Sequence, residues 1–161
     1  MARENSSKLD KEDRQILNII QRDCLRPVEQ IAFETGLSAS SVQRRVRRMR
    51  TEGVIERQVA VVDAKKLGFP LTFVAALEVE RERKELLVRL KQWLEREEAI
   101  QQAIYVTGAA DVILTVIAPD IEAYDELTQR LLEDNPNVRR LTTSVGLQVY
   151  KRGLFVPTGS P

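Results

Sequence analysis

Hydrophobic residues in the first third of the chain recur at the three- and four-residue spacing of helices. Four apolar residues between positions 16 and 20 predict a first helix over about residues 11–22, with Asp10 as its N-cap. A second helix is predicted over about residues 28–35, with Ile31 and Ala32 facing inward. We expect the first helix to pack behind the two that follow it.

A tight turn and a third helix follow. Gly36 can take the left-handed conformation that ends a helix, and Ser38 is a good N-cap for the next one. Val42, Val46 and Met49 then recur at i, i+4 and i+7, so they form one apolar stripe along that helix. The order of helix, tight turn and helix predicts a helix-turn-helix motif.

Beyond Gly53 the pattern changes to strands alternating with helices. The β-branched residues in 54–62 predict a strand, which is either a wing of the head, a linker, or both. Six further elements are predicted as strands 71–79, 100–106, 112–118 and 138–150, with helices over 82–97 and from Pro119-Asp120 to Asn135-Pro136. The order βαββαβ predicts a ferredoxin-like α+β fold.

These elements divide the chain into five segments. They are a disordered N-terminus (1–8), the helix-turn-helix domain (9–53), a linker strand (54–69), the ferredoxin-like domain (70–151) and a C-terminal tail (152–161).

The two central strands of the predicted sheet are apolar on both faces. Residues 112–118 carry apolar side chains at odd and even positions, and residues 71–79 behave similarly. Such strands need cover on both faces, yet a βαββαβ unit places both helices on one face. A second copy of the domain is the simplest cover, which predicts a homodimer. The alternative is that residues 54–62 or the tail cover the second face of the sheet.

Charge adds a candidate function to the third helix. Five arginines lie between positions 44 and 50, and no acidic residue lies between Glu34 and Glu52. Residues 1–62 hold 12 Lys/Arg against 9 Asp/Glu, whereas residues 63–161 hold 13 against 15, so the basic excess is local. An arginine-rich face opposite a narrow apolar stripe suits a DNA groove, although a solvated helix face can look the same.

The predicted DNA-binding residues lie on or beside the face opposite the apolar stripe. They are Ser38, Ser40, Ser41, Gln43, Arg44, Arg47 and Arg48. Arg45 lies nearer to the stripe, and we expect it to pair with an acid of the head such as Asp13.

Cysteine and histidine usage limits the chemistry available. The single cysteine, Cys24, allows no internal disulfide, and without a signal peptide pattern this indicates a reducing cytoplasm. No apolar run reaches the length of a membrane span. The chain has no histidine, no Gly-rich phosphate loop and no nucleophile elbow, so we expect no enzyme, no catalytic residue, no metal site and no cofactor.

Two stretches resemble a known family of regulators. The segments LDKEDRQIL, IAFETGLSASSVQRRVRRM, EGVI and KKLG closely resemble the N-terminal half of the Lrp/AsnC, or feast/famine, family. The later segment VTGAADVILTV resembles that family's second signature. The resemblance implies a helix-turn-helix head and a ferredoxin-like effector and dimerisation domain. It also implies assembly as dimers and their multiples, such as octamers, and an amino acid or related effector.

The resemblance places the effector between C-terminal domains, near the Thr-Gly turn. The candidate effector residues are Thr107, Gly108, Ala109, Ala110 and Asp111, with Thr142 and Ser144 on the last strand. One departure is that two alanines stand where the family usually has a polar or acidic residue followed by an aromatic one. We therefore expect an apolar amino acid, a ligand of another type, or no ligand.

Three functions remain in competition at this point. The leading one is a sequence-specific transcriptional regulator that binds double-stranded DNA. An architectural protein that compacts DNA without gene-specific control is the main alternative. An enzyme on a ferredoxin-like scaffold is disfavoured by the missing histidine and phosphate loop.

Overall fold

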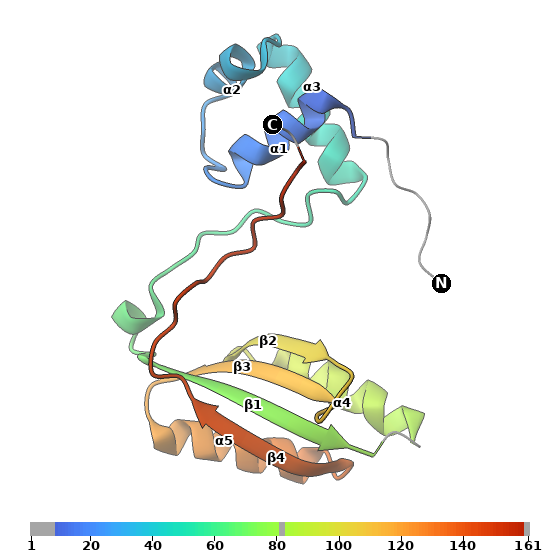
Figure 1. Cartoon of the computed structure of the whole chain (residues 1–161), viewed down its shortest axis with the longest axis vertical. Coiled ribbons are helices and arrows are strands. Elements are labelled where there is room, and N and C mark those ends of the chain that lie inside the picture. Colours follow the sequence, from blue (N-terminus) through green and yellow to red (C-terminus); the bar gives the residue numbers. More distant parts are fainter. Residues whose placement is uncertain (1–8, 81–82, 160–161) are drawn as a thin grey trace. The chain divides into compact units, whose positions relative to one another are not determined.

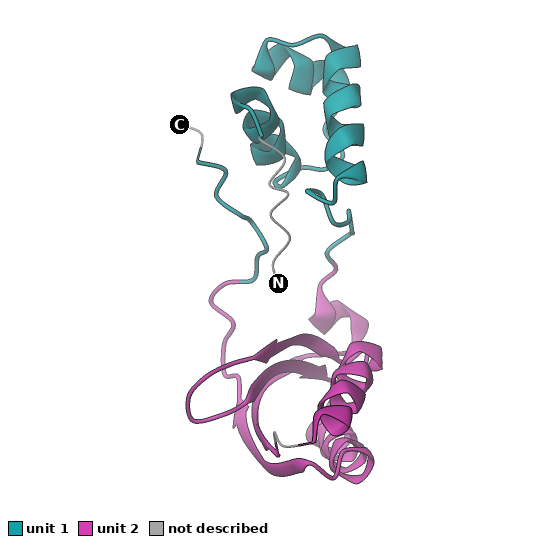
Figure 2. Ribbon diagram, turned by 90° about the vertical axis from the view of Figure 1, so that its right-hand side faces the viewer, with its two compact units in different colours: residues 1–61, 152–161 teal, residues 62–151 magenta. Residues whose placement is uncertain are grey.

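The computed structural model describes residues 9–80 and 83–159. The chain forms two compact units, drawn in two colours in Figure 2: residues 1–61 with 152–161, and residues 62–151. The C-terminal tail, expected as a separate segment, therefore belongs to the same unit as the helix-turn-helix head. The N-terminal stretch 1–8, expected to be disordered, lies outside the described residues.

The head contains three helices built around one small core. They are α1 (Lys11–Ile20), α2 (Val28–Thr35) and α3 (Ala39–Thr51), labelled in Figure 1. Five residues that are all less than a tenth exposed form the core: Ile16, Ile31, Ala32, Val42 and Met49. Asp10 is the N-cap of α1, as predicted, and it forms a capping box with Asp13.

The predicted strand over residues 54–62 is wrong. Val54 and Ile55 donate their backbone N–H groups to the carbonyl oxygen of Met49, at 2.9 and 3.1 Å, and pack on the head core. Residues 56–62 have no regular secondary structure and join no sheet within the described chain. Their β-branched residues favour extended backbone, but a strand also needs a neighbour. A 3₁₀ helix, η1 (Ala64–Leu67), follows and was not predicted.

The second unit is a four-stranded antiparallel sheet with two helices. Its elements are β1 (Leu71–Val79), α4 (Lys84–Arg96), β2 (Ile100–Tyr105), β3 (Val112–Ala118), α5 (Ile121–Asp134) and β4 (Val138–Val145). The strand order is β2-β3-β1-β4, which confirms the ferredoxin-like prediction.

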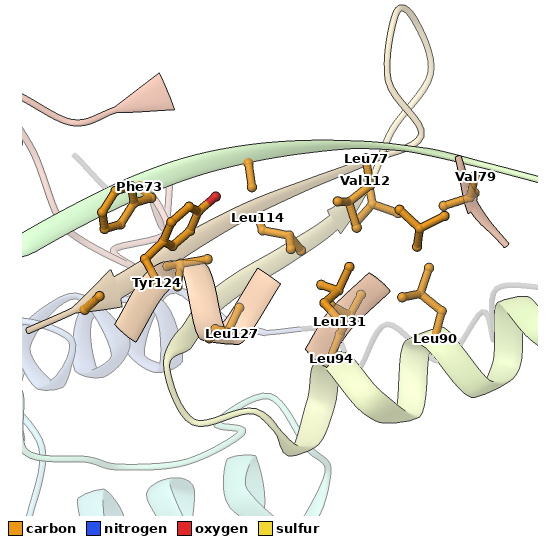
Figure 3. Packing of buried hydrophobic residues seen from close by; sticks show 14 residues of the cluster. Phe73, Leu77, Val79, Leu90, Leu94, Val112, Leu114, Tyr124, Leu127 and Leu131 are labelled. Atoms are coloured by element: carbon orange, nitrogen blue, oxygen red, sulfur yellow. The ribbon is translucent and has the colours of Figure 1, made fainter. Parts of the chain in front are cut away.

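Both helices cover the same face of this sheet (Figure 1). Figure 3 shows the core between them, where Leu90 and Leu94 of α4 and Leu127 and Leu131 of α5 meet side chains from the strands. The Phe73 and Tyr124 rings stack with centroids 3.8 Å apart. At the outer edge of this layer, the Trp93 indole Nε1 donates to Asp134 Oδ2 at 2.8 Å.

The opposite face has no cover from described residues of this unit. Val74 of β1 is 42% exposed and Ile104 of β2 is 53% exposed. The intervening β3 residues that point to this face are half-buried, whereas alternate residues of β3 are buried under the helices. We call the side chains of Val74, Ala76, Ile104, Ile113 and Ile117 the open face.

The last strand is shorter than the predicted 138–150. Its pairing with β1 ends where Gly146 donates its N–H to the carbonyl oxygen of Thr72 at 2.8 Å. A Cβ at Gly146 would lie 2.9 Å from that same oxygen, so the close approach requires glycine. Further pairing would need a donor at Pro70, which has no N–H. Leu147 and Val149 therefore keep the alternating apolar pattern of a strand although they lie beyond the end of the sheet.

Candidate nucleic-acid interface and effector loop

The turn between α2 and α3 is built as the sequence predicts. Gly36 has φ +70°, in the left-handed region, and the N–H of Leu37 donates to Ala32 O at 3.0 Å, which closes the end of α2. Ser38 then caps α3, because its Oγ accepts from the N–H of Ser41 at 3.2 Å. This turn fixes the direction in which α3 leaves α2.

The apolar stripe of α3 faces the head core and leaves the opposite face outward. Val42 and Met49 are fully buried. The outward residues Gln43, Arg44 and Arg47 are exposed, and neither arginine side chain has an ion pair with another residue in the described part of the chain. Two unpaired guanidinium groups on the outer face of a helix are positioned to meet an anionic partner.

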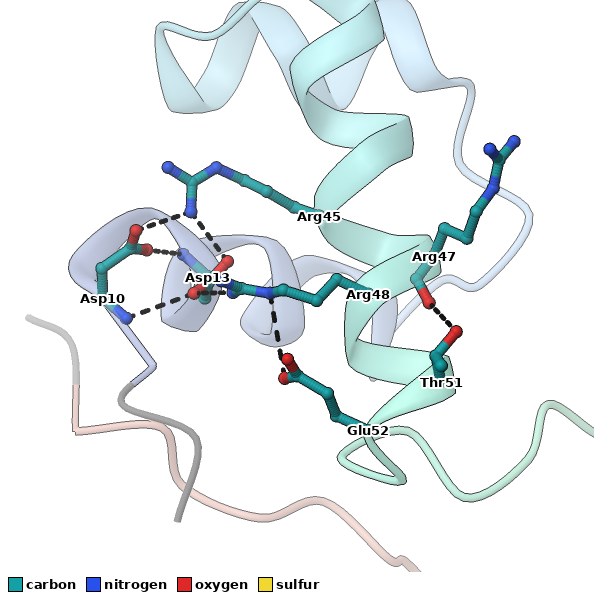
Figure 4. Close-up of polar contacts among 7 residues, drawn as sticks. All are labelled: Asp10, Asp13, Arg45, Arg47, Arg48, Thr51 and Glu52. Carbon is teal, nitrogen blue, oxygen red and sulfur yellow. Dashed lines mark hydrogen bonds and ion pairs between the residues drawn. The ribbon is translucent and has the colours of Figure 1, made fainter. Parts of the chain in front are cut away.

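The arginines nearer the stripe are held by acids of α1 (Figure 4). Asp13, which is fully buried, accepts from Arg45 Nη1 at 2.9 Å and from Arg48 Nη2. Arg45 also reaches Asp10 Oδ2 at 2.6 Å. The predicted pairing of Arg45 with Asp13 is confirmed. Arg47 points away from this group.

Arg48 differs from the other predicted DNA-binding residues. Besides Asp13, its Nε lies 3.8 Å from Glu52, and its side chain is 42% exposed. Two acids therefore compete with any phosphate for this guanidinium, so its contact with DNA stays a prediction with less support than those of Arg44 and Arg47. The absence of acidic residues between Glu34 and Glu52 did not indicate this pairing, because Asp13 belongs to another helix, α1.

The surroundings of Asp10 lower the pKa of its carboxyl. Burial by itself would raise this pKa, but the hydrogen bond from the Asp13 N–H and the bond and charge of Arg45 outweigh burial and lower it to about 2. Asp10 is therefore ionised at any physiological pH. It holds the N-terminus of α1 against α3.

The predicted effector loop joins β2 to β3. Thr107, Gly108 and Ala109 are exposed, Ala110 is half-buried, and Gly108 has φ +131°, which favours glycine. Asp111 is buried, and its Oδ2 accepts from the N–H of Val79 at 2.7 Å. This carboxylate fastens the start of β3 to the end of β1, so the role of Asp111 in effector binding stays a prediction beside this structural role.

The fold does not bring Thr142 and Ser144 to this loop within one chain. Thr142 lies opposite Ala76 on one side of β1, while Ile113 lies opposite Ala76 on the other side. Two strand spacings, about 10 Å, therefore separate β4 from β3. A site that used both sets of residues would have to span this distance or draw one set from a second chain.

Comparison with known proteins assigns both units. Residues 9–50 match the AsnC-type helix-turn-helix domain, and residues 72–154 match the Lrp/AsnC ligand binding domain. The chain belongs to the Lrp/AsnC family. It is therefore a transcriptional regulator with an AsnC-type helix-turn-helix domain and an Lrp/AsnC ligand binding domain.

Two similar proteins match nearly the whole chain. An uncharacterized HTH-type transcriptional regulator, y4tD, of Sinorhizobium fredii is 36% identical over 93% of this chain and 89% of its own. An AsnC family regulator from Agrobacterium tumefaciens has a similar structure, with TM-score 0.86, 28% identity and coverage of 92% and 96%.

A feast or famine regulatory protein from M. tuberculosis has been solved in complex with L-methionine. It matches this chain with TM-score 0.79 and 25% identity, covering 89% of this chain and 95% of its own.

Within residues 9–80 and 83–159, no helix has the length and apolar character needed to cross a membrane.

Proposed function

We propose that this protein is a dimeric, sequence-specific regulator whose α3 helices read the major groove of double-stranded DNA. The observation that carries the proposal is the pair Arg44 and Arg47, exposed on the outer face of α3 and without an acid partner among the described residues. A bidentate arginine discriminates guanine from other bases by about 1–3 kcal/mol. A contact to phosphate instead adds affinity for all sequences. Ser38, Ser40, Ser41 and Gln43 lie beside these arginines and can supply polar contacts.

The open face supports the dimer. Its five side chains are apolar and lack cover from the described residues of their own unit, as the exposure of Val74 and Ile104 shows. Thr115, Thr142 and Ser144 are their polar neighbours on the same face of the sheet. Two copies packed face to face would cover it and present two recognition helices. A two-fold dimer of this kind suits half-sites about one helical turn, near 34 Å, apart. The operator is then expected to be roughly palindromic.

We infer that an effector binds between C-terminal domains, against residues 107–111. The relative from M. tuberculosis in complex with L-methionine supports an amino-acid effector. In this chain the loop offers the Thr107 hydroxyl and the backbone around Gly108, while Ala109 and Ala110 offer no polar side-chain group. Thr142 and Ser144 of a second chain can add hydroxyls. An apolar amino acid fits this set better than a charged one.

The test of DNA reading uses the full-length protein on a site selected from random duplexes. Arg44→Ala and Arg47→Ala are each expected to weaken binding to that site by roughly 5- to 150-fold, the range that about 1–3 kcal/mol represents. Arg89→Ala, which removes the same charge from exposed α4, is the control and should change little. Unchanged binding in both head variants would refute the recognition-helix assignment.

The footprint separates regulation from compaction. A regulator protects a few sites, whereas an architectural protein coats DNA uniformly at stoichiometric protein.

The effector is tested by calorimetry with the common amino acids and with Gly108→Glu and Asp111→Ala variants. A tight ligand whose affinity neither change alters would move the site away from this loop.

A further inference from the structure

We propose that the outward face of α1 is a docking site for the chain's own C-terminal tail, residues 152–159. The central contact is a paired one between a side-chain amide and a peptide group. Gln21 Nε2 donates to the carbonyl oxygen of Val156 at 3.1 Å, and Gln21 Oε1 accepts from the Val156 N–H at 2.8 Å. The amide thus satisfies both polar groups of one tail residue, as a neighbouring β-strand would.

Two arginines extend this contact in both directions along the tail. The guanidinium carbon of Arg22 lies 4.2 Å from the centroid of the Phe155 ring, a cation–π geometry. Arg22 is itself held in place, because Nη1 donates to Asn18 O at 2.6 Å. Arg14 Nη1 donates to the carbonyl oxygen of Thr158 at 2.8 Å. Three tail residues are thereby bound by α1, by its C-cap Gln21 and by the next residue, Arg22.

The tail uses a different side of α1 from the one that holds the recognition helix. Arg14 and Gln21 are seven residues apart, so they lie nearly above one another on the helix. Asp13 and Ile16 occupy the inner side, where Asp13 binds Arg45 and Arg48 of α3. Docking of the tail therefore leaves the outward arginines of α3 free to bind DNA.

Docking closes a loop in the chain. Residues 62–151 are joined to the head by the backbone at residue 61, and the docked tail joins them to it a second time through residue 152. A head held at two points has fewer orientations than a head held at one, so it loses less entropy when two heads bind one operator. This step rests on the proposed DNA binding, whereas the docking itself does not.

Hydrogen exchange of the full-length protein tests the docking. The Val156 amide is expected to exchange at least tenfold more slowly in the wild type than in Gln21→Leu, and Phe155→Ala should also accelerate it. Phe155→Ala leaves α1 unchanged and so excludes a simple loss of the head fold. Leu154→Ala is the control, because Leu154 is 77% exposed on the same tail. If wild-type Val156 exchanges as fast as an unstructured peptide, or if Gln21→Leu has no effect, the proposal fails.

Mixed assemblies distinguish the chain's own tail from that of a second copy. A Gln21→Leu chain and a chain ending at Lys151 are co-expressed with different affinity tags, and any complex that carries both tags is isolated. In this complex the tail belongs to the Gln21→Leu chain, whose own head lacks the docking amide. If each tail docks on its own head, Val156 therefore stays unprotected. Restored protection would show that the tail crosses to the partner, and would overturn docking within one chain.

DNA binding tests the consequence separately. Phe155→Ala is expected to bind a two-half-site operator at least threefold more weakly, with unchanged affinity for a single half-site. Equal losses on both DNAs would refute the restriction of head orientation. Unchanged operator binding by both Arg44→Ala and Arg47→Ala, with Val156 still protected, would refute the proposed DNA reading and leave the docking of the tail intact.

Discussion

At the scale of single residues, Asp13 holds α3 against α1. It is fully buried, shares the capping box of α1 with Asp10, and accepts from two arginines of α3. A buried carboxylate is tolerated only when its charge is compensated in this way. The same residue therefore starts one helix and fixes the position of another.

Replacing Asp13 by alanine should destabilise the head strongly. The change removes the partner of Arg45 and Arg48 and leaves Arg45, whose side chain is 19% exposed, with Asp10 alone. We expect a loss of about 2–4 kcal/mol in the free energy of unfolding of the head. Urea denaturation followed by circular dichroism measures it, and Glu12→Ala, which removes a neighbouring half-buried carboxylate from the same helix, is the control. A loss no larger than that of the control would show that the cluster is not stabilising.

Asp10 gives the head an acid-dependent stability. Its folded pKa, about 2, lies below the ordinary value of 3.8, so the folded state binds fewer protons than the unfolded state between these values. The stabilisation is therefore complete above about pH 4 and is lost as the pH falls through about 2.

Asp10→Asn should remove this part of the pH dependence. Thermal unfolding at a series of pH values between 2 and 5 is the measurement. The melting temperature of the wild type is expected to fall more steeply with acid than that of the variant. Parallel curves would mean that other carboxyl groups account for the acid sensitivity.

At the scale of elements, the end of β4 depends on one glycine. Gly146 approaches the backbone of β1 so closely that a Cβ would lie 2.9 Å from the carbonyl oxygen of Thr72. Gly146→Ala should therefore push β4 away from β1 and destabilise the second unit by about 1–3 kcal/mol. Gly153→Ala is the matched control, since nothing lies within 4 Å of a Cβ built there. Equal stability of the two variants would contradict the expected clash.

Most elements could be predicted from the sequence because their pattern and their partners agree. α2, β1 and β3 have the predicted boundaries. Residues 56–62 and 147–150 fail for a shared reason, since extended backbone is a local property whereas a strand also needs a neighbour. The 3₁₀ helix η1 was missed because Asp63 caps only four residues, too few to show a period.

The candidate site was predictable where it depends on one helix and less so where it depends on several. The outward direction of Arg44 and Arg47 follows from the stripe of α3 alone. The restraint on Arg48 depends on Asp13, 35 residues earlier, and the anchoring of Asp111 depends on Val79. Such pairings arise from tertiary packing and cannot be predicted from helical periodicity.

At the scale of the whole molecule, the open face should control assembly. Val74→Lys and Ile104→Lys place charges on an apolar surface that two copies are proposed to share, and like charges brought together there cost several kcal/mol. We expect the wild type to sediment as a dimer or a larger assembly at micromolar concentration, and each variant to sediment as a monomer. Val88→Lys, on the exposed side of α4, is the control. A dimeric Ile104→Lys protein would exclude this face as the interface.

The position of the only tryptophan makes the second unit optically distinct. Trp93 is the only tryptophan of the chain, and its indole is fixed between α4 and α5. Its emission spectrum therefore follows the melting of residues 62–151 alone, with no signal from the head. Cys24, the only cysteine, is exposed on the head and accepts a thiol-reactive dye. Energy transfer from the indole to that dye then measures the distance between the two units without any substitution. This distance can be followed in solution as DNA or an amino acid is added.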